Sequence, residues 1–372
     1  MRTDNTIKAF FALVRGGLWE EEVHLSQYRD VLFNEVLKLA EEQSVVGLVA
    51  AGLEHVADEK VQKEIVLQFV GQALQLEQQN KAMNCFIGEL IKRLRGDDIY
   101  TLLVKGQGIA QCYERPLWRS CGDVDLFLSD DNYEKARNLL LPLGKLTEPE
   151  EATKKHLSIK VGEWIVELHG TLRSGLSYKI DKMLDIIKKD VFYGGNVRSW
   201  NNGSTQVFIP SANCDVIYVF THILQHFFKG GIGIRQVCDW SRLLWKYQEQ
   251  IDANLLEKRV RKMGLISEWR AFGVFAVEYL GMPAEAMPLY SSEDKWERKA
   301  SRIKSFIIEV GNFGHNRDTS YMMKYPYLQR KCISAWRRVK DMIRHARIFP
   351  LDSIRFLWGI LFNGLKSTLK GE

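Results

Sequence analysis

Helical periodicity dominates the N-terminal part of the chain. Apolar residues recur at steps of three and four over residues 35–54 and again over 61–94, with few glycines and no proline, which is the pattern of amphipathic helices. Residues 1–17 have only a short apolar run and predict a helix rather than a signal peptide. The polar centre of the second long segment, residues 77–81, indicates either a surface face or a break. We therefore expect an all-helical lobe over residues 1–96.

Shorter apolar runs follow this lobe. Four of them have the length and the apolar or β-branched character of strands: residues 100–104, 123–128, 156–160 and 164–169. Gly162 separates the last two, which predicts a hairpin, and residues 130–140 carry an apolar stripe that predicts a helix. A further short strand, residues 206–209, ends at Pro210.

From residue 211 onward the helical pattern returns. The chain therefore predicts an α+β fold in which a small mixed-sheet core lies between two helical regions. The expected domains are the helical lobe of residues 1–96, an α/β core of residues 97–210 and a C-terminal helical region of residues 211–372.

Composition narrows the class of protein. Hydrophobic residues make up 46% of the chain and charged residues 26%, which is ordinary for a soluble protein. No uninterrupted apolar stretch reaches the roughly 18 residues that a transmembrane helix needs. The six cysteines are scattered without a C-x-x-C pair, which argues against a zinc ribbon or a disulfide framework. This cysteine usage favours a cytoplasmic location.

Two aspartates stand on the strand predicted at residues 123–128. Side chains alternate along a strand, so Asp123 and Asp125 point to one face while Val124 and Leu126 point into a core. At ~5 Å and an effective dielectric constant of ~20, two such carboxylates repel each other by roughly 3 kcal/mol. A divalent cation removes this cost, and Mg²⁺ prefers carboxylate oxygens together with phosphate and water. The spacing alone fits equally well a solvent-facing edge strand with hydrated aspartates.

A lysine and two glycines follow the strand predicted at residues 100–104. Gly106 and Gly108 permit a tight turn and the close approach of a ligand to the backbone. The Lys105 ammonium can pair with phosphate groups, or it can form an ion pair with Asp123 or Asp125. The two interpretations are compatible, because a metal ion or a substrate can displace the ion pair.

Four short motifs occur together in this part of the chain. They are Lys105-Gly106, Tyr113-x-x-Pro116-x-x-Arg119, Gly122-Asp123-x-Asp125 and Glu167-x-His169. The combination resembles the bacterial family of uncharacterised nucleotidyltransferases, in the superfamily typified by DNA polymerase β. The motifs cover roughly residues 100–170, and the surrounding helices follow the family in outline. One departure is that better-studied relatives in the superfamily generally have Gly-Ser where this chain has Lys105-Gly106.

The resemblance implies a metal-dependent nucleotidyltransferase, which transfers a nucleoside monophosphate from a nucleoside triphosphate such as ATP to a hydroxyl acceptor. The residues implied as catalytic, and as ligands of Mg²⁺ or Mn²⁺, are Asp123, Asp125 and Glu167. The residues implied to contact the substrate are Lys105, Gly106, Arg119 and His169. The acceptor is open between a small molecule, a protein side chain and an RNA end.

Several of these assignments have a simpler alternative. Glu163 competes with Glu167 as the third carboxylate, although it stands at the turn end of the hairpin. Arg119 can be an exposed loop arginine, and His169 can be a structural histidine at the end of a strand.

Two histidines stand four residues apart on the helix predicted after residue 211. His222 and His226 share a face and could ligate zinc, but Ile223 replaces the glutamate of the H-E-x-x-H motif. The resembled family has this helix, a glycine turn and an Arg-x-x-x-Asp helix, here Arg235 and Asp239, after its catalytic lobe. These residues either line the acceptor side of a cleft or make buried polar contacts.

The C-terminal region carries the positive charge of the chain. Between Lys324 and Arg347 there are eight basic residues and one acid, a net charge of +7 against +6 for the whole chain. An amphipathic segment with aromatic residues follows at residues 351–370. This pattern is typical of contact with an anionic membrane surface, of nucleic-acid binding, or simply of a solvated basic face.

Two other function classes fit part of the pattern. Nucleotide-sugar glycosyltransferases use a D-x-D motif to hold a metal ion and a diphosphate, but they usually place a larger βαβ nucleotide fold ahead of it. A non-catalytic nucleotide-binding or scaffold protein on the same fold is the other alternative. Turnover of a sugar nucleotide would favour the first, and absence of metal binding the second.

Overall fold

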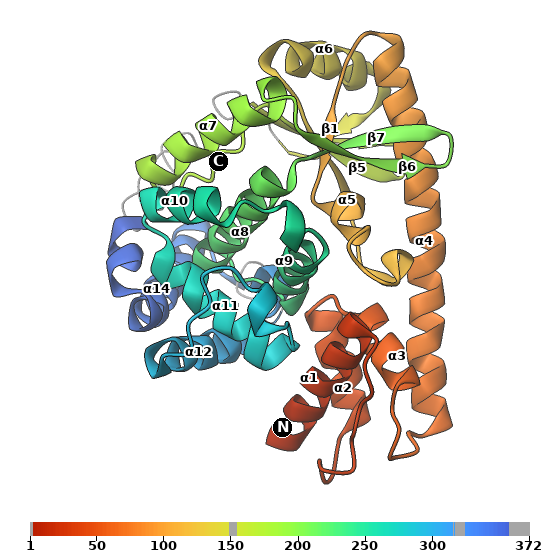
Figure 1. The fold of residues 1–372 in the computed structure, drawn as a ribbon, viewed down its shortest axis with the longest axis vertical. Helices are drawn as coiled ribbons and strands as arrows, with labels where there is room; N and C mark the ends of the chain where they lie inside the picture. Colours follow the sequence, from red (N-terminus) through yellow and green to blue (C-terminus); the bar gives the residue numbers. More distant parts are fainter. Residues whose placement is uncertain (1–2, 149–154, 315, 317–323, 357–372) are drawn as a thin grey trace.

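The N-terminal part of the protein is helical, as the pattern predicts. The computed structural model describes residues 3–148, 155–314, 316 and 324–356 (Figure 1). Four helices precede the first strand: α1 (Asp4–Trp19), α2 (Phe33–Glu42), α3 (Val46–Glu54) and α4 (Lys63–Gly96). The 34-residue helix α4 runs along one side of the molecule, from the N-terminal helices past the sheet (Figure 1).

Residues 35–54 form two helices where the periodicity predicts one continuous segment. The chain breaks between α2 and α3 because Ser44 has a φ of 56°, in the left-handed region that a helix does not use. The buried side chain of Gln43 donates to the Ile307 carbonyl and accepts from the Ile234 N–H. These contacts of Gln43 at the break connect the N-terminal helices to the C-terminal half of the chain.

The polar centre of α4 is not a break. Gln78, Gln79 and Lys81 are exposed, while Asn80 is fully buried on the opposite face of the helix. The Asn80 amide donates to two carbonyls of the segment that precedes β2. The helix thus uses one polar residue to hold a loop and the others to face solvent.

A small mixed sheet follows, as predicted. Its strands are β1 (Leu102–Val104), β2 (Asp123–Phe127), β3 (Lys145–Leu146), β4 (His156–Val161) and β5 (Trp164–His169), in the order β1-β2-β5-β4-β3. β2 and β5 are parallel, and the other neighbouring strands are antiparallel. The two central strands therefore run side by side in the same direction.

The sheet has one apolar face and one polar face. Val124, Leu126, Val166 and Leu168 are buried in a cluster with residues of α4 and of α6 (Asp130–Leu140). On the other face Phe127 contacts Phe192 of α7 (Tyr178–Tyr193), with ring centroids 4.8 Å apart. The alternation that the sequence shows along β2 and β5 decides which side chains lie on which face.

A second hairpin follows the sheet. It consists of β6 (Val197–Asn202) and β7 (Thr205–Pro210), and β7 packs beside β1. The sequence predicts the second of these strands but not the first. β6 reads Val-Arg-Ser-Trp-Asn-Asn, alternates between exposed and half-exposed positions, and so lacks the apolar run that signals a strand.

The C-terminal region is a layered set of helices on the side of the molecule opposite α4 (Figure 1). They are α8 (Ala212–Lys229), α9 (Ile234–Lys246), α10 (Ala253–Met263), α11 (Ile266–Leu280), α12 (Asp294–Val310) and α14 (Tyr327–Ile348). Their core is aromatic, with Phe220 packed against Trp240, Trp269 and Phe272. The same hydrophobic cluster includes α1 and α3, so the two helical regions share one core.

Short elements complete the fold. They are α5 (Gly106–Ala110) and the 3₁₀ turns η1 (Pro116–Trp118), η2 (Leu141–Leu143), η4 (Gln248–Gln250), η5 (Ala284–Ala286) and η6 (Asn312–Gly314). Within the described ranges, no helix has the length and apolar character that crossing a membrane requires. Of the amphipathic segment predicted at residues 351–370, everything after residue 356 lies outside the described residues.

Candidate active site

The polar face of the sheet brings together the side chains singled out on β2 and β5. Asp125 pairs with Glu167 and Phe127 with His169 in the parallel register. Partners in a parallel pair point to the same face, so Asp123, Asp125, Glu167 and His169 all lie on it. The backbone alone therefore places three carboxylates and one imidazole side by side.

Asp125 lies at the centre of this group. It is 2% exposed, and its Oδ1 lies 2.6 Å from Lys105 Nζ and 2.7 Å from His169 Nε2. Burial alone would lower the pKa of Lys105, but the Asp125 carboxylate outweighs it and raises that pKa above its ordinary value. Burial also opposes the charged form of His169, and contact with Asp125 and Glu167 raises its pKa. Asp125 is thus a buried carboxylate held between the Lys105 ammonium and the His169 imidazole.

The Lys105 backbone is strained. β1 ends at Val104 and α5 begins at Gly106, and between them Lys105 has φ 56° and ψ −148°. Residues with side chains rarely adopt this conformation, which costs on the order of 1–3 kcal/mol and persists where the surroundings enforce it. Gly106 also has a positive φ, and a Cβ there would lie only 3.2 Å from Cys121 Sγ. The turn needs glycine at 106 and directs the Lys105 ammonium to Asp125.

Asp123 has a different environment from Asp125. It is half-buried, and no ion pair to its carboxylate is found within the described part of the chain. The Asp125 charge, followed by burial, raises the pKa of Asp123 to about 6. Asp123 therefore lies beside other negative charge without a direct ion pair of its own in the described residues, and the carboxylate oxygens of the two aspartates fit a hard divalent cation such as Mg²⁺.

Glu167 contacts two imidazoles. Its Oε2 lies 3.3 Å from His156 Nε2 and 3.4 Å from His169 Nε2. Burial opposes ionisation of this carboxyl, but the two imidazoles outweigh burial and lower the pKa of Glu167. The competing Glu163 is exposed in the turn between β4 and β5, away from this contact.

The sequence reasoning missed His156. In the antiparallel pairing of β4 and β5, His156 lies directly opposite His169, and the two ring centroids are 4.9 Å apart. Counting outward from the turn at Gly162 places these two residues opposite each other, so the hairpin itself carried the signal that could have found it.

Helix α8 lines the site with uncharged side chains. Tyr218, His222 and His226 follow one another at steps of four, with ring centroids 6.3 Å and 4.4 Å apart. Burial, followed by the charge of Lys105, lowers the pKa of His222 well below its ordinary value and that of His226 to about 4. Over the described residues, the group of three or more metal-binding side chains is His156, Glu167 and His169, which does not include the α8 histidines.

Arg119 lies apart from the contacts around Asp125. It is 4% exposed, and its guanidinium makes two hydrogen bonds of 2.9 and 2.6 Å to the Asp239 carboxylate of α9. The Tyr113 hydroxyl donates to the same carboxylate, and Asn80 holds the Arg119 carbonyl. These contacts fix the segment between α5 and β2 to its neighbours. The predicted contact of Arg119 with a phosphate stays a prediction.

Arg235 is a basic residue near the aspartates that the sequence reasoning did not place there. Its Nη1 donates to the Ser120 carbonyl at 2.9 Å, while its buried Nε has no hydrogen-bond partner within the described chain. The Arg235 charge lowers the pKa of Asp123, whereas the Asp125 charge raises it. The sequence offered Arg235 only as part of an Arg-x-x-x-Asp pattern.

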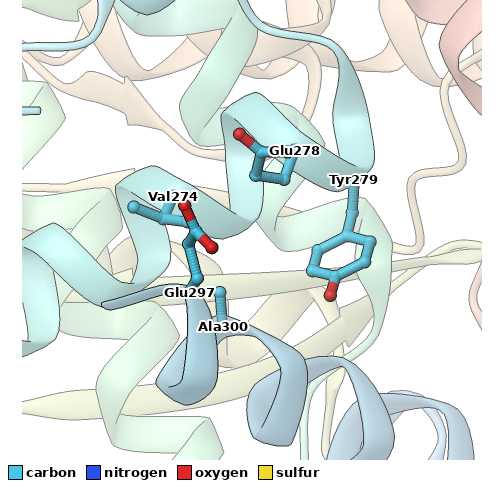
Figure 2. Close-up of a pocket in the computed structure, with 5 residues that line it drawn as sticks. All are labelled: Val274, Glu278, Tyr279, Glu297 and Ala300. Atoms are coloured by element: carbon cyan, nitrogen blue, oxygen red, sulfur yellow. The ribbon is translucent and has the colours of Figure 1, made fainter. Parts of the chain in front are cut away.

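A separate pocket lies between α11 and α12. It is lined by Val274, Glu278, Tyr279, Glu297 and Ala300 (Figure 2). These two helices lie at the other end of the molecule from the strands (Figure 1). The pocket therefore takes no part in the polar face of the sheet.

Comparison with protein families matches residues 30–281 to the family described as uncharacterised nucleotidyltransferases. The chain belongs to this family. The match runs from α2 to α11 and includes the whole polar face of the sheet, while α12 and α14 lie beyond it. No curated protein and no solved structure matches the chain. Membership of the family supports a nucleotidyltransferase activity in general terms and implies a nucleoside triphosphate substrate.

Proposed function

We propose that this protein is a metal-dependent nucleotidyltransferase, which transfers a nucleoside monophosphate from a nucleoside triphosphate to a hydroxyl acceptor. The observation that carries the proposal is the position of three carboxylates on two adjacent parallel strands, in a chain of this family. A transferase of this kind needs acidic side chains that neutralise a metal–triphosphate complex and orient the acceptor.

Asp123, Asp125 and Glu167 are the residues that would hold Mg²⁺ or Mn²⁺. Bound there, such an ion neutralises the charge that develops on the triphosphate during transfer. The raised pKa of Asp123 supports this assignment, because the charges of Asp125 and Glu167 contribute to it and a bound cation would offset them.

Lys105, Arg235, Gly106 and His169 act on the substrate in this proposal. The Lys105 ammonium and the Arg235 guanidinium are positive groups beside the aspartates, suited to the α-, β- and γ-phosphates. Gly106 lets the turn approach the substrate closely, and His169 orients Glu167 and contacts a phosphate oxygen.

Glu167 orients the acceptor. The imidazoles that lower its pKa keep it ionised near neutral pH, so it accepts a hydrogen bond from the attacking hydroxyl. In-line attack of that oxygen on the α-phosphorus, with its proton passing to Glu167, forms the new ester bond and breaks the bond to pyrophosphate, which leaves. The uncharged wall of α8 then faces the acceptor side.

The test identifies the phosphate product. The protein is incubated with Mg²⁺ and each nucleoside triphosphate, with pools of small molecules, proteins and RNA as acceptors, and pyrophosphate and orthophosphate are measured separately. We expect acceptor-dependent pyrophosphate release that Asp125→Asn abolishes. Release of orthophosphate with a nucleoside diphosphate would contradict the proposal. Turnover of sugar nucleotides instead would indicate a glycosyltransferase. Binding of a triphosphate without formation of any product would indicate a non-catalytic protein.

We also propose that α14 contacts an anionic membrane surface from the cytoplasmic side. Trp336, Val339 and Ile343 follow each other at helical spacing and are 62%, 38% and 48% exposed. Exposed Lys340 and Arg347 stand four residues after Trp336 and Ile343, so positive charge lies beside the apolar stripe.

The test of this contact is co-sedimentation with vesicles. We expect the protein to sediment with vesicles that contain phosphatidylserine, and Trp336→Ala to weaken this binding. Equal binding to uncharged phosphatidylcholine vesicles, or binding to RNA in place of vesicles, would contradict it.

A further inference from the structure

We propose that His156, Glu167 and His169 form a second metal site, which takes a first-row transition-metal ion such as Zn²⁺ or Co²⁺ in preference to Mg²⁺. The site shares Glu167 with the proposed nucleotidyl transfer, but its three ligands can bind an ion whether or not transfer occurs. It lies on the same face of the sheet as the aspartate pair, and its ligands come from β4 and β5.

The spacing of the ligand atoms favours a metal over hydrogen bonds. Three atoms, one from each residue, lie within 4.8 Å of one another, and Glu167 Oε2 is 3.3 Å and 3.4 Å from the two Nε2 atoms. Hydrogen bonds between charged partners are usually shorter, at ~2.7–2.9 Å. Ligands bound at about 2.0–2.1 Å to a tetrahedral ion are separated by roughly 3.3–3.4 Å. The two separations from Glu167 match the second geometry.

The sheet holds these ligands in place. His156 and His169 are direct partners in the antiparallel pairing of β4 and β5. Glu167 is two residues before His169 on the same strand, so all three side chains point to one face. Ligands on paired strands are held more rigidly than ligands on loops.

The site is partly exposed to solvent. The side chains of His156, Glu167 and His169 are 29%, 24% and 12% exposed. An ion can therefore enter from solvent and keep one position for water or a phosphate oxygen. Three protein ligands with one open position are the arrangement of catalytic rather than structural zinc sites.

The ligand types decide which ion is preferred. Imidazole nitrogen suits Zn²⁺, Co²⁺ and related ions, whereas Mg²⁺ prefers oxygen ligands throughout. The aspartate pair on β2 offers only oxygen. The polar face therefore presents two neighbouring sites of different chemistry. An ion bound by His169 Nε2 would replace the 2.7 Å contact of that nitrogen with Asp125 Oδ1, because one ring nitrogen cannot bind an ion and donate a hydrogen bond at once.

The experiment titrates the full-length protein, stripped of metal by a chelator, with Co²⁺ and with Zn²⁺ alone. Visible absorption of the Co²⁺ complex reports coordination geometry, and calorimetry reports the affinity for Zn²⁺. We expect one ion per chain, an intense tetrahedral Co²⁺ spectrum and little competition from Mg²⁺. His156→Ala and the polar variant His156→Gln should each weaken Zn²⁺ binding by more than ~100-fold, beyond the effect usual for residues that only support a ligand.

His24→Ala is the matched control. His24 is an exposed histidine beside Glu22 and Asp58, and its loss should leave Zn²⁺ binding unchanged. The inference is overturned if both His156 variants remain folded by circular dichroism and bind Zn²⁺ like the native protein, or if Mg²⁺ displaces Zn²⁺ at equal concentration. A different result is that Zn²⁺ binds as expected and Asp123→Asn leaves triphosphate binding unchanged. That result would support the metal site and contradict the proposed nucleotidyl transfer.

Discussion

Asp123 and Asp125 are two residues apart on one strand face, yet their carboxylates differ in burial and in ion-pair partners. Asp125 is buried between Lys105 and His169, whereas Asp123 is half-buried and has its pKa raised to about 6. The first carboxylate is fixed by the protein, and the second has charge available for an incoming cation. The D-x-D pattern thus describes one acid in direct contact with Lys105 and His169 and one without a direct ion pair in the described residues.

Glu167→Gln tests the role of the third carboxylate. An amide cannot accept the acceptor's hydrogen bond as strongly, so we expect the rate of transfer to fall by about 10²–10⁴-fold. Triphosphate affinity in the presence of Mg²⁺ should fall less than the rate, because Glu167 is one of three metal ligands and Lys105 and both aspartates remain. Single-turnover pyrophosphate release and calorimetry measure the two quantities separately. Glu163→Gln, in the exposed turn, should leave both unchanged, and equal effects of the two variants would contradict the assignment.

The sequence anticipated this part of the site because strand alternation is local information. Asp123 and Asp125, or Glu167 and His169, share a face whatever the rest of the chain does. His156 needed the register of a hairpin, which is information from two strands. The strained turn at Lys105 is harder to predict than either, because a lysine in the sequence gives no indication of a φ of 56°.

At the scale of elements, the segment before β2 is held by buried polar contacts. Arg119 and Tyr113 meet the Asp239 carboxylate of α9, and Asn80 of α4 holds the carbonyls of Leu117 and Arg119. Two helices from different halves of the chain therefore fix the approach to the first aspartate. This explains why the motif needs an arginine, independently of any phosphate contact.

Asp239→Asn should destabilise the protein strongly. It leaves the 4% exposed Arg119 without its counter-charge, and breaking a buried ion pair in this way costs about 3–5 kcal/mol. The matched control is Asp185→Asn, which breaks a similar two-bond pair with Arg173 whose side chains are 58% and 37% exposed. That change should cost less than about 1 kcal/mol. Urea unfolding measures both, and similar losses would contradict the structural role of Arg119.

Other elements show where local patterns stop being informative. The periodicity of residues 35–54 continues through a break that Ser44 makes with a left-handed conformation and that Gln43 secures with contacts to residues far along the chain. β6 is a strand because β7 pairs with it, although its own side chains carry little apolar signal. Both features depend on tertiary contacts, which outweigh local propensity.

At the scale of the molecule, the N-terminal and C-terminal helices share one hydrophobic cluster. Phe11 of α1 packs against Phe275 and Tyr279 of α11. The expected boundaries at residues 96/97 and 210/211 describe changes of secondary structure along the chain and, as domain boundaries, stay a prediction. The common core holds the two helical regions around the sheet.

Glu268 gives this core a pH dependence. Burial, followed by the nearby Asp352 carboxyl, raises the pKa of Glu268 well above its ordinary value, and Lys299 acts weakly in the other direction. The native protein then keeps a proton that the unfolded chain loses above pH ~4.3. The contribution of Glu268 to native stability is therefore greatest below that pH and falls by up to about 1.4 kcal/mol per pH unit as the pH rises.

Glu268→Gln should remove this dependence. The neutral amide does not titrate, so we expect a flatter dependence of the unfolding free energy between about pH 5 and 7, and a more stable variant at the upper end. Urea unfolding at several pH values provides the measurement. Glu278→Gln, exposed on the same helix, serves as the control and should retain the native slope. Parallel curves for the native protein and Glu268→Gln would contradict the prediction.

The central claim is that the aspartates of β2 bind a metal–triphosphate complex. The most direct test is calorimetric titration with each of the four nucleoside triphosphates, with and without Mg²⁺. The proteins compared are the native protein, Asp123→Asn and the exposed control Asp131→Asn. We expect at least one triphosphate to bind more than ~10-fold more tightly with Mg²⁺, in line with ions that bind through carboxylates and substrate phosphates. This gain should vanish in Asp123→Asn and persist in Asp131→Asn. Triphosphate binding that is indifferent to Mg²⁺ and to Asp123→Asn, or no binding at all, would contradict the account.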